Sequence, residues 1–150
     1  MPKPKPSTVG PIILDTHVWI WMMEGASRAL SPATVSLVES AGGRSELAVS
    51  AISVWELAML ETKGRITLSR SIDEWVNAAL TAEGMRLAQL TPEIALESSR
   101  LPGDVHGDPA DRMIVATARV LGATLVTCDE QILQYGSAGH VRVRNGRARS

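Results

Sequence analysis

Four acidic side chains lie at the ends of expected strands or in the helices that follow them: Asp15, Glu56, Asp111 and Asp129. Asp15 directly follows a short apolar run, and Asp129 comes just after another. Because ligands of an open α/β sheet bind outside the carboxyl ends of the strands, we expect the four carboxylates to converge there. Their mutual repulsion at close range would be costly without a cation. The pattern therefore predicts a metal site.

Oxygen ligands of this kind favour a hard divalent ion such as Mg²⁺. Mg²⁺ usually takes one or two carboxylates and waters, which leaves room for substrate phosphate oxygens. A pair of such ions would clamp the attacking and leaving oxygens of a phosphodiester displacement, and the metal would supply hydroxide near neutral pH. The predicted chemistry is hydrolysis of a phosphate ester by metal-activated water.

Each acid also has a purely structural interpretation. Asp15 and Asp129 are both placed to cap the helix that follows. Asp108, with Pro109 at the first helical position and Asp111 at the third, resembles a capping box. Glu56 is harder to explain in this way, because an unpaired carboxylate in an otherwise apolar stretch is expensive to bury. Only the joint placement of the acids favours the metal site.

The elements that must position these residues alternate along the chain. Apolar runs indicate strands at 12–14, 47–49, 85–90 and 124–127, with an edge strand at 141–143. Capping signals and apolar periodicity indicate helices at 16–24, 31–42, 53–64, 71–80, 91–100 and 108–121, with a short one starting at 129. Such alternation predicts an α/β fold in which helices cover both faces of a central, mostly parallel sheet, giving three α/β/α layers.

The length of 150 residues fits one domain. We expect a proline-rich leader at 1–10, the domain at 11–143 and a basic tail at 144–150. A single cysteine excludes a disulfide framework and a multi-cysteine zinc site. The leader lacks the apolar core of a signal peptide, and no apolar run is long enough to span a membrane. The expected compartment is the cytoplasm.

The net charge of −1 excludes a uniformly basic nucleic-acid binder. Its distribution is uneven: all 16 acids lie between Asp15 and Glu130 with nine of the 15 cations, so this body carries a formal charge of −7. Arg142, Arg144, Arg147 and Arg149 lie beyond it. This arginine-rich end is either a solvated, frayed terminus or a contact to RNA phosphates.

Four segments together resemble the PIN-domain family, and in particular the VapC-type toxins of prokaryotic type II toxin–antitoxin modules. They are Ile13-Leu14-Asp15-Thr16-His17-Val18-Trp19, Ser53-Val54-Trp55-Glu56-Leu57, Asp108-Pro109-Ala110-Asp111-Arg112-Met113-Ile114-Val115-Ala116-Thr117-Ala118 and Leu125-Val126-Thr127-Cys128-Asp129. The resemblance covers about residues 11–135. It implies a three-layer α/β/α fold and an endoribonuclease that depends on Mg²⁺ or Mn²⁺ and leaves 3′-hydroxyl and 5′-phosphate ends.

The resemblance also assigns roles. The family's acidic positions fall on Asp15, Glu56, Asp111 and Asp129, with Asp108 as an additional acid of the subgroup. Thr16 and Thr127 match hydroxyl positions near the site. The implied partners are RNA, a second copy of the chain in a homodimer, and a cognate VapB-type antitoxin whose tail blocks the acidic pocket.

Several points stay open at this stage. Arg112 is placed to pair either with phosphate or with a neighbouring acid. The apolar segment 18–23 is either core or, with Trp55, part of a groove for the antitoxin or the second copy. Two other functions would use the same residues. One is a PIN-like binding module without catalysis, and the other is a metal-dependent phosphatase or DNA nuclease.

Overall fold

The computed structural model describes residues 10–25, 29–103, 105 and 107–148. Five strands form one sheet in the order β3-β2-β1-β4-β5, and all four neighbouring pairs are parallel. The strands are β1 (Ile12–Leu14), β2 (Leu47–Ser50), β3 (Met85–Ala88), β4 (Thr124–Thr127) and β5 (Val143–Asn145). Apart from Gly10, the expected leader at 1–10 lies outside the described residues.

Seven helices in the described ranges connect and cover these strands. They are α1 (Thr16–Glu24), α2 (Pro32–Gly43), α3 (Ala51–Thr62), α4 (Ile72–Thr81), α5 (Pro92–Ser99), α6 (Pro109–Leu121) and α7 (Glu130–Ser137). Most start where the sequence placed a capping residue: the Ser31 hydroxyl accepts from the Thr34 N–H, and Asp108 accepts from the Asp111 N–H. None of the helices in these ranges is long and apolar enough to cross a membrane.

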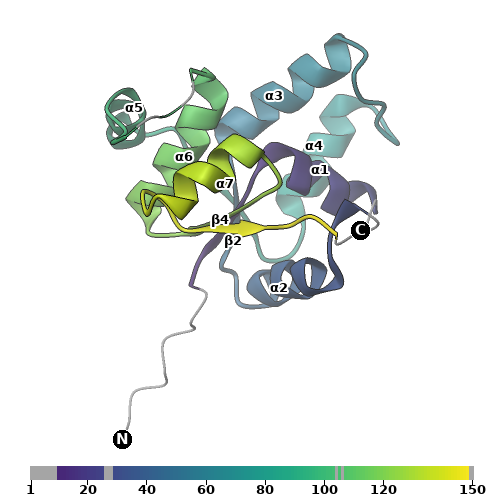
Figure 1. Cartoon of the computed structure of the whole chain (residues 1–150). Helices are drawn as coiled ribbons and strands as arrows, with labels where there is room; N and C mark the ends of the chain where they lie inside the picture. The colour runs from purple at the N-terminus through teal and green to yellow at the C-terminus, as the bar shows by residue number, and fades with distance from the viewer. Residues whose placement is uncertain (1–9, 26–28, 104, 106, 149–150) are drawn as a thin grey trace, which may run out of the picture.

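The sheet has a hydrophobic core on each face. Ile12 and Leu14 point to a cluster formed with α1, α2 and α4, whereas Ile13 between them points to a cluster formed with α5, α6 and α7. In Figure 1, α5, α6 and α7 gather on one side of the molecule and α2 lies on the other. Helix α3 contributes to both clusters, through Leu57 and Ile52. The predicted three-layer α/β/α fold is confirmed.

Segment 18–23 belongs mainly to the first cluster. Val18, Trp19 and Ile20 are buried, and residues 21–23 are half-buried against the same cluster. The interpretation of this segment as core is therefore confirmed for Val18, Trp19 and Ile20.

The central position of β1 explains why functional side chains collect at one edge of the sheet. Leu14, its last residue, pairs with Val49 on one side and with Val126 on the other. The N–H of Asp15 then donates to the carbonyl of Val126 over 2.9 Å, which places this carboxylate beside the end of β4.

The C-terminal end differs from the expectation. Strand β5 spans Val143–Asn145, two residues later than the expected edge strand at 141–143. The N–H of Ser31 donates to the carbonyl of Gly146 over 3.0 Å, and the N–H of Ala148 donates to Ala29 over 3.1 Å. Hydrogen bonds to distant backbone thus hold residues 144–148 in the domain, whereas composition placed them in a basic tail.

Candidate active site

Asp15 lies at the carboxyl end of β1 and is 7% exposed. One carboxylate oxygen, Oδ1, accepts from the N–H of Thr16 over 2.8 Å, and Oδ2 accepts from the hydroxyl of Thr127 over 2.6 Å. Asp15 is therefore both the cap of α1 and a carboxylate fixed at the sheet edge. Thr127, expected near the site, orients it.

Glu56 lies on α3 and reaches the same place from the other side. The Thr16 hydroxyl donates to Glu56 Oε1 over 2.5 Å and lies 2.8 Å from the Ser53 hydroxyl. Thr16 and Ser53 are both buried, so the three side chains form a short chain of polar contacts between α1 and α3. Ser53 begins one of the four segments that resemble PIN domains, but a serine at this position does not by itself indicate a contact with Thr16.

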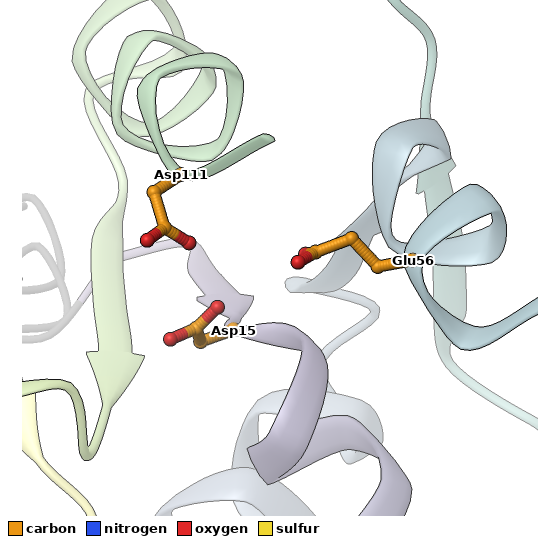
Figure 2. Close-up of side chains that lie close together, drawn as sticks. All are labelled: Asp15, Glu56 and Asp111. Carbon is orange, nitrogen blue, oxygen red and sulfur yellow. The ribbon is translucent and has the colours of Figure 1, made fainter. Parts of the chain in front are cut away.

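Asp108 and Asp111 belong to the start of α6. Asp108 Oδ1 accepts from the N–H of Asp111 over 3.0 Å, which is the predicted cap. Asp108 is exposed, and Asp111 is half-buried. Figure 2 shows the Asp111 carboxylate pointing from α6 toward those of Asp15 and Glu56.

The three carboxylates of Asp15, Glu56 and Asp111 converge. One oxygen from each lies within 4.8 Å of the others, and they approach from three different elements (Figure 2). A cavity of about 340 Å³ surrounds them, lined by Asp15, His17, Trp21, Glu56, Asp108, Asp111, Cys128, Asp129 and Arg147. We call it the acidic cavity.

Asp129 lines the acidic cavity but lies outside the group of three. Its Oδ1 accepts from the N–H of Ile132 over 3.0 Å, so it caps α7. Its own N–H donates to the Thr127 hydroxyl over 3.0 Å. Thr127 thus contacts both Asp15 and Asp129, and couples the two acids at the end of β4.

Repulsion and burial make this cavity unfavourable for three ionised carboxylates. Burial, reinforced by Asp15, Asp108, Glu56 and Asp129, raises the pKa of Asp111 to about 8. Burial also raises the pKa of Asp15, against the hydrogen bonds from Thr127 and Thr16. The pKa of Glu56 is likewise raised, first by burial. A cation among these oxygens would relieve the repulsion.

The donor set fits a hard divalent cation. All three converging groups offer carboxylate oxygens, the ligands that Mg²⁺ and Mn²⁺ take. Asp111 and Glu56 are only half-buried, so the site keeps access for waters or phosphate oxygens. Asp15, Glu56 and Asp111 are the residues that would hold the ion.

Two arginines lie elsewhere than expected. The Nε of Arg112 donates to the carbonyl of Ser98 over 3.0 Å, so its side chain turns toward α5 and away from the acidic cavity. Arg147, assigned to the tail from the sequence, lines this cavity, with its Nη2 on the carbonyl of Cys128 at 3.4 Å. The cluster of arginines near the chain end indicated a possible phosphate contact in the sequence, but it did not distinguish Arg147 from its neighbours.

Comparison with known proteins decides the family. The family model described as PIN domain matches residues 12–137. The chain belongs to the PIN domain family. This PIN domain is also 40% identical over 124 residues to Ribonuclease VapC22 of Mycobacterium tuberculosis, which covers 83% of this chain and 91% of that protein. The resemblance to VapC-type proteins, expected from the four motifs, is confirmed.

Solved structures share the PIN fold at lower identity. VapBC2 from Rickettsia felis, bound to a DNA fragment from the promoter, matches with a TM-score of 0.63 and 16% identity, over 90% of this chain and 98% of that one. FitAcB from Neisseria gonorrhoeae matches with a TM-score of 0.59 and 20% identity, over 89% and 96%. A toxin–antitoxin complex from Klebsiella pneumoniae matches with a TM-score of 0.59 and 17% identity, over 92% and 99%.

Proposed function

We propose that this PIN domain is a metal-dependent endoribonuclease and the toxin of a type II toxin–antitoxin module, acting on RNA in the cytoplasm. The convergence of Asp15, Glu56 and Asp111 within 4.8 Å carries the proposal, since it offers a divalent ion carboxylate oxygens from three elements at one point. The 40% identity to a protein named a ribonuclease supports RNA as the substrate.

Asp15, Glu56 and Asp111 hold Mg²⁺ or Mn²⁺ in this proposal, and Asp129 adds a fourth carboxylate to the cavity. When bound there, the ion neutralises phosphate charge and makes a water molecule more acidic. The hydroxyls of Thr127 and Thr16 keep the carboxylates of Asp15 and Glu56 oriented.

Arg147 has a separate part in the proposed reaction. Among the described residues, Arg147 is the arginine that lines the acidic cavity, and a guanidinium is well suited to contact phosphate oxygens. We assign to it the phosphate contact that the sequence left open for the arginine-rich end.

We also propose a cognate VapB-type antitoxin and a homodimer as partners. The toxin–antitoxin complexes among the structural relatives support the antitoxin, and the family resemblance supports the dimer. Co-expression with a candidate VapB-type antitoxin, followed by purification and mass determination by light scattering, tests both. Recovery of a lone monomer under co-expression would contradict them.

Asp15→Asn tests the proposed function. The substitution removes a ligand charge but keeps an acceptor for Thr127 or Thr16, so the fold should remain. We expect RNA cleavage in Mg²⁺ or Mn²⁺ to fall at least about 100-fold, because even loss of a residue that supports a ligand costs 10- to 100-fold. Asp73→Asn is the matched control: it removes the same charge at an exposed position on α4.

Substrate class is read from the same preparation. Parallel assays on RNA, DNA and small phosphate esters should show cleavage of RNA alone. Activity that Asp15→Asn leaves intact would overturn the site. Absence of any metal-dependent cleavage would instead indicate a binding module.

A further inference from the structure

A second groove adjoins the acidic cavity and shares the side chains of Glu56 and Asp108 with it. It encloses about 240 Å³ between α3 and the start of α6. Its lining consists of Trp55, Glu56, Met59, Leu60, Lys63, Arg65, Asp108, Pro109 and Ala110. We call it the Trp55 groove. Because Glu56 and Asp108 line both hollows, the Trp55 groove lies directly beside the acidic cavity.

Trp55 differs from the tryptophans of the core. Trp19 and Trp75 are buried at 0% and 3% exposure and pack edge-to-face, with ring centroids 5.0 Å apart. Trp55 is 55% exposed, although it immediately precedes Glu56, whose carboxylate converges with those of Asp15 and Asp111. An exposed indole beside a nuclease site offers a flat surface on which a base can stack.

The Trp55 groove also carries positive charge. Lys63 and Arg65 are exposed, and neither forms an ion pair with a carboxylate in the described ranges. Trp55 and Met59 lie four residues apart on one side of α3, and Lys63 follows the helix as its C-cap.

We propose that the Trp55 groove binds single-stranded RNA next to the cleaved phosphodiester, with a base stacked on Trp55 and backbone phosphates on Lys63 and Arg65. The inference rests on the proposed function and adds a substrate-binding subsite to it. Stacking surfaces combined with cations are how proteins hold single strands without reading every base. Adjacency to the acidic cavity and the pair of cations favour RNA over a protein partner as the occupant.

The test is binding of a fluorescein-labelled single-stranded RNA octamer to the full chain, followed by anisotropy in Ca²⁺, with the RNA checked on a gel afterwards. We expect Trp55→Ala to weaken binding about 5- to 100-fold, the range found for loss of one stacked base. Trp55→Phe keeps an aromatic face and should bind within about 3-fold of the wild type. Leu96→Ala is the matched control, because Leu96 is also 55% exposed but lies on α5, outside the groove.

Tryptophan fluorescence gives a second readout. RNA should quench the emission of the wild type, and this quenching should be smaller in Trp55→Phe even though binding persists, with Trp21 in the acidic cavity accounting for the remainder. Lys63→Gln and Arg65→Gln should each weaken RNA binding and lower its salt dependence. If the Trp55 groove held no RNA and Trp55 had only a structural role, both substitutions would leave the salt dependence of RNA binding unchanged.

The outcomes separate this inference from the proposed function. If the wild type binds and cleaves RNA while Trp55→Ala binds equally well, the groove proposal is overturned and the ribonuclease stands. If Trp55→Ala keeps RNA binding but loses the co-expressed antitoxin, the groove is a protein-docking surface and the proposal is again overturned. If the wild type neither binds nor cleaves RNA, the proposed function itself fails.

Discussion

The carboxyl group of Asp111 responds to all the other acids of the cavity. Burial and these charges raise its pKa to about 8, whereas in the unfolded chain the value is about 3.9. Between the two values the folded, metal-free protein holds a proton that the unfolded chain has released. Raising the pH through this window therefore lowers the free energy of unfolding.

We accordingly expect the Tm in EDTA to fall as the pH rises from about 5 to about 8. The fall should be smaller in Asp111→Asn, which has no proton to lose. Added Mg²⁺ or Mn²⁺ should reverse the trend, because the ion competes with the proton and binds more tightly at higher pH. Thermal unfolding over this pH range, with and without metal, measures all three effects. Equal slopes in the wild type and Asp111→Asn would contradict the assignment.

The limits of prediction at the residue scale follow from sequence separation. Asp15 and Asp111 were predicted because strand ends and helix starts are local signals, and Glu56 because a carboxylate in an apolar stretch is expensive to bury unpaired. The contact of Thr16 with Glu56 joins residues 40 positions apart, and that of Thr127 with Asp15 joins residues 112 apart. Such pairings depend on strand register and helix packing, which cannot be predicted from local sequence patterns.

Helical geometry explains the position of Arg112. Adjacent residues on a helix do not face each other, so a side chain next to Asp111 turns about 100° away from it. With Asp111 in the acidic cavity, Arg112 reaches Ser98 on α5. The orientation of Arg112 away from Asp111 could therefore have been predicted from helical periodicity once α6 had been predicted.

At the scale of elements, the helix starts were predicted to within one residue except for α3, which begins two residues before the expected start, and the last strand begins two residues after its own. Ser31-Pro32 and Asp108-Pro109 specify a helix start within a few residues, because the cap accepts from its own first turn. Strand β5 instead takes its place from pairing with β4, in the register Leu125 with Val143 and Thr127 with Asn145. No local pattern fixes that register.

The position of β5 has a functional consequence. Strand β5, followed by the isolated bridge between Leu30 and Arg147, places Arg147 in the lining of the acidic cavity. We expect Arg147→Gln to lower kcat/KM for RNA by about 10- to 100-fold, the worth of one hydrogen bond to a charged group. Arg144→Gln is the matched control, because it removes the same charge from an exposed position on β5 that does not line the cavity.

Steady-state cleavage of a short RNA in Mg²⁺ measures this difference. Thermal unfolding should show similar stability for the two variants, which excludes loss of fold as the cause. Equal losses of activity in both would assign the effect to overall charge and contradict a local contact by Arg147.

At the scale of the whole molecule, charge separates two ways of holding RNA. All 16 acids lie between Asp15 and Glu130, so the body of the chain repels phosphate in general. A protein that tracks RNA with a broad basic surface makes many phosphate contacts, and its affinity falls steeply with salt. Here the cations in the two adjoining hollows are Lys63, Arg65 and Arg147, so few phosphates are neutralised by side chains.

A single strand loses about 0.7 in the slope of log K against log salt for each neutralised phosphate. Three contacts therefore predict a slope of about −2 at constant free Ca²⁺, measured by RNA anisotropy between about 50 and 200 mM KCl. Arg147→Gln should make the slope shallower by about 0.7, and Arg144→Gln should leave it unchanged. A slope steeper than about −4 would mean that RNA also follows the arginine-rich chain end. The acidic body would then be held to its substrate by a basic arm, and the metal site would contribute less of the affinity than its geometry implies.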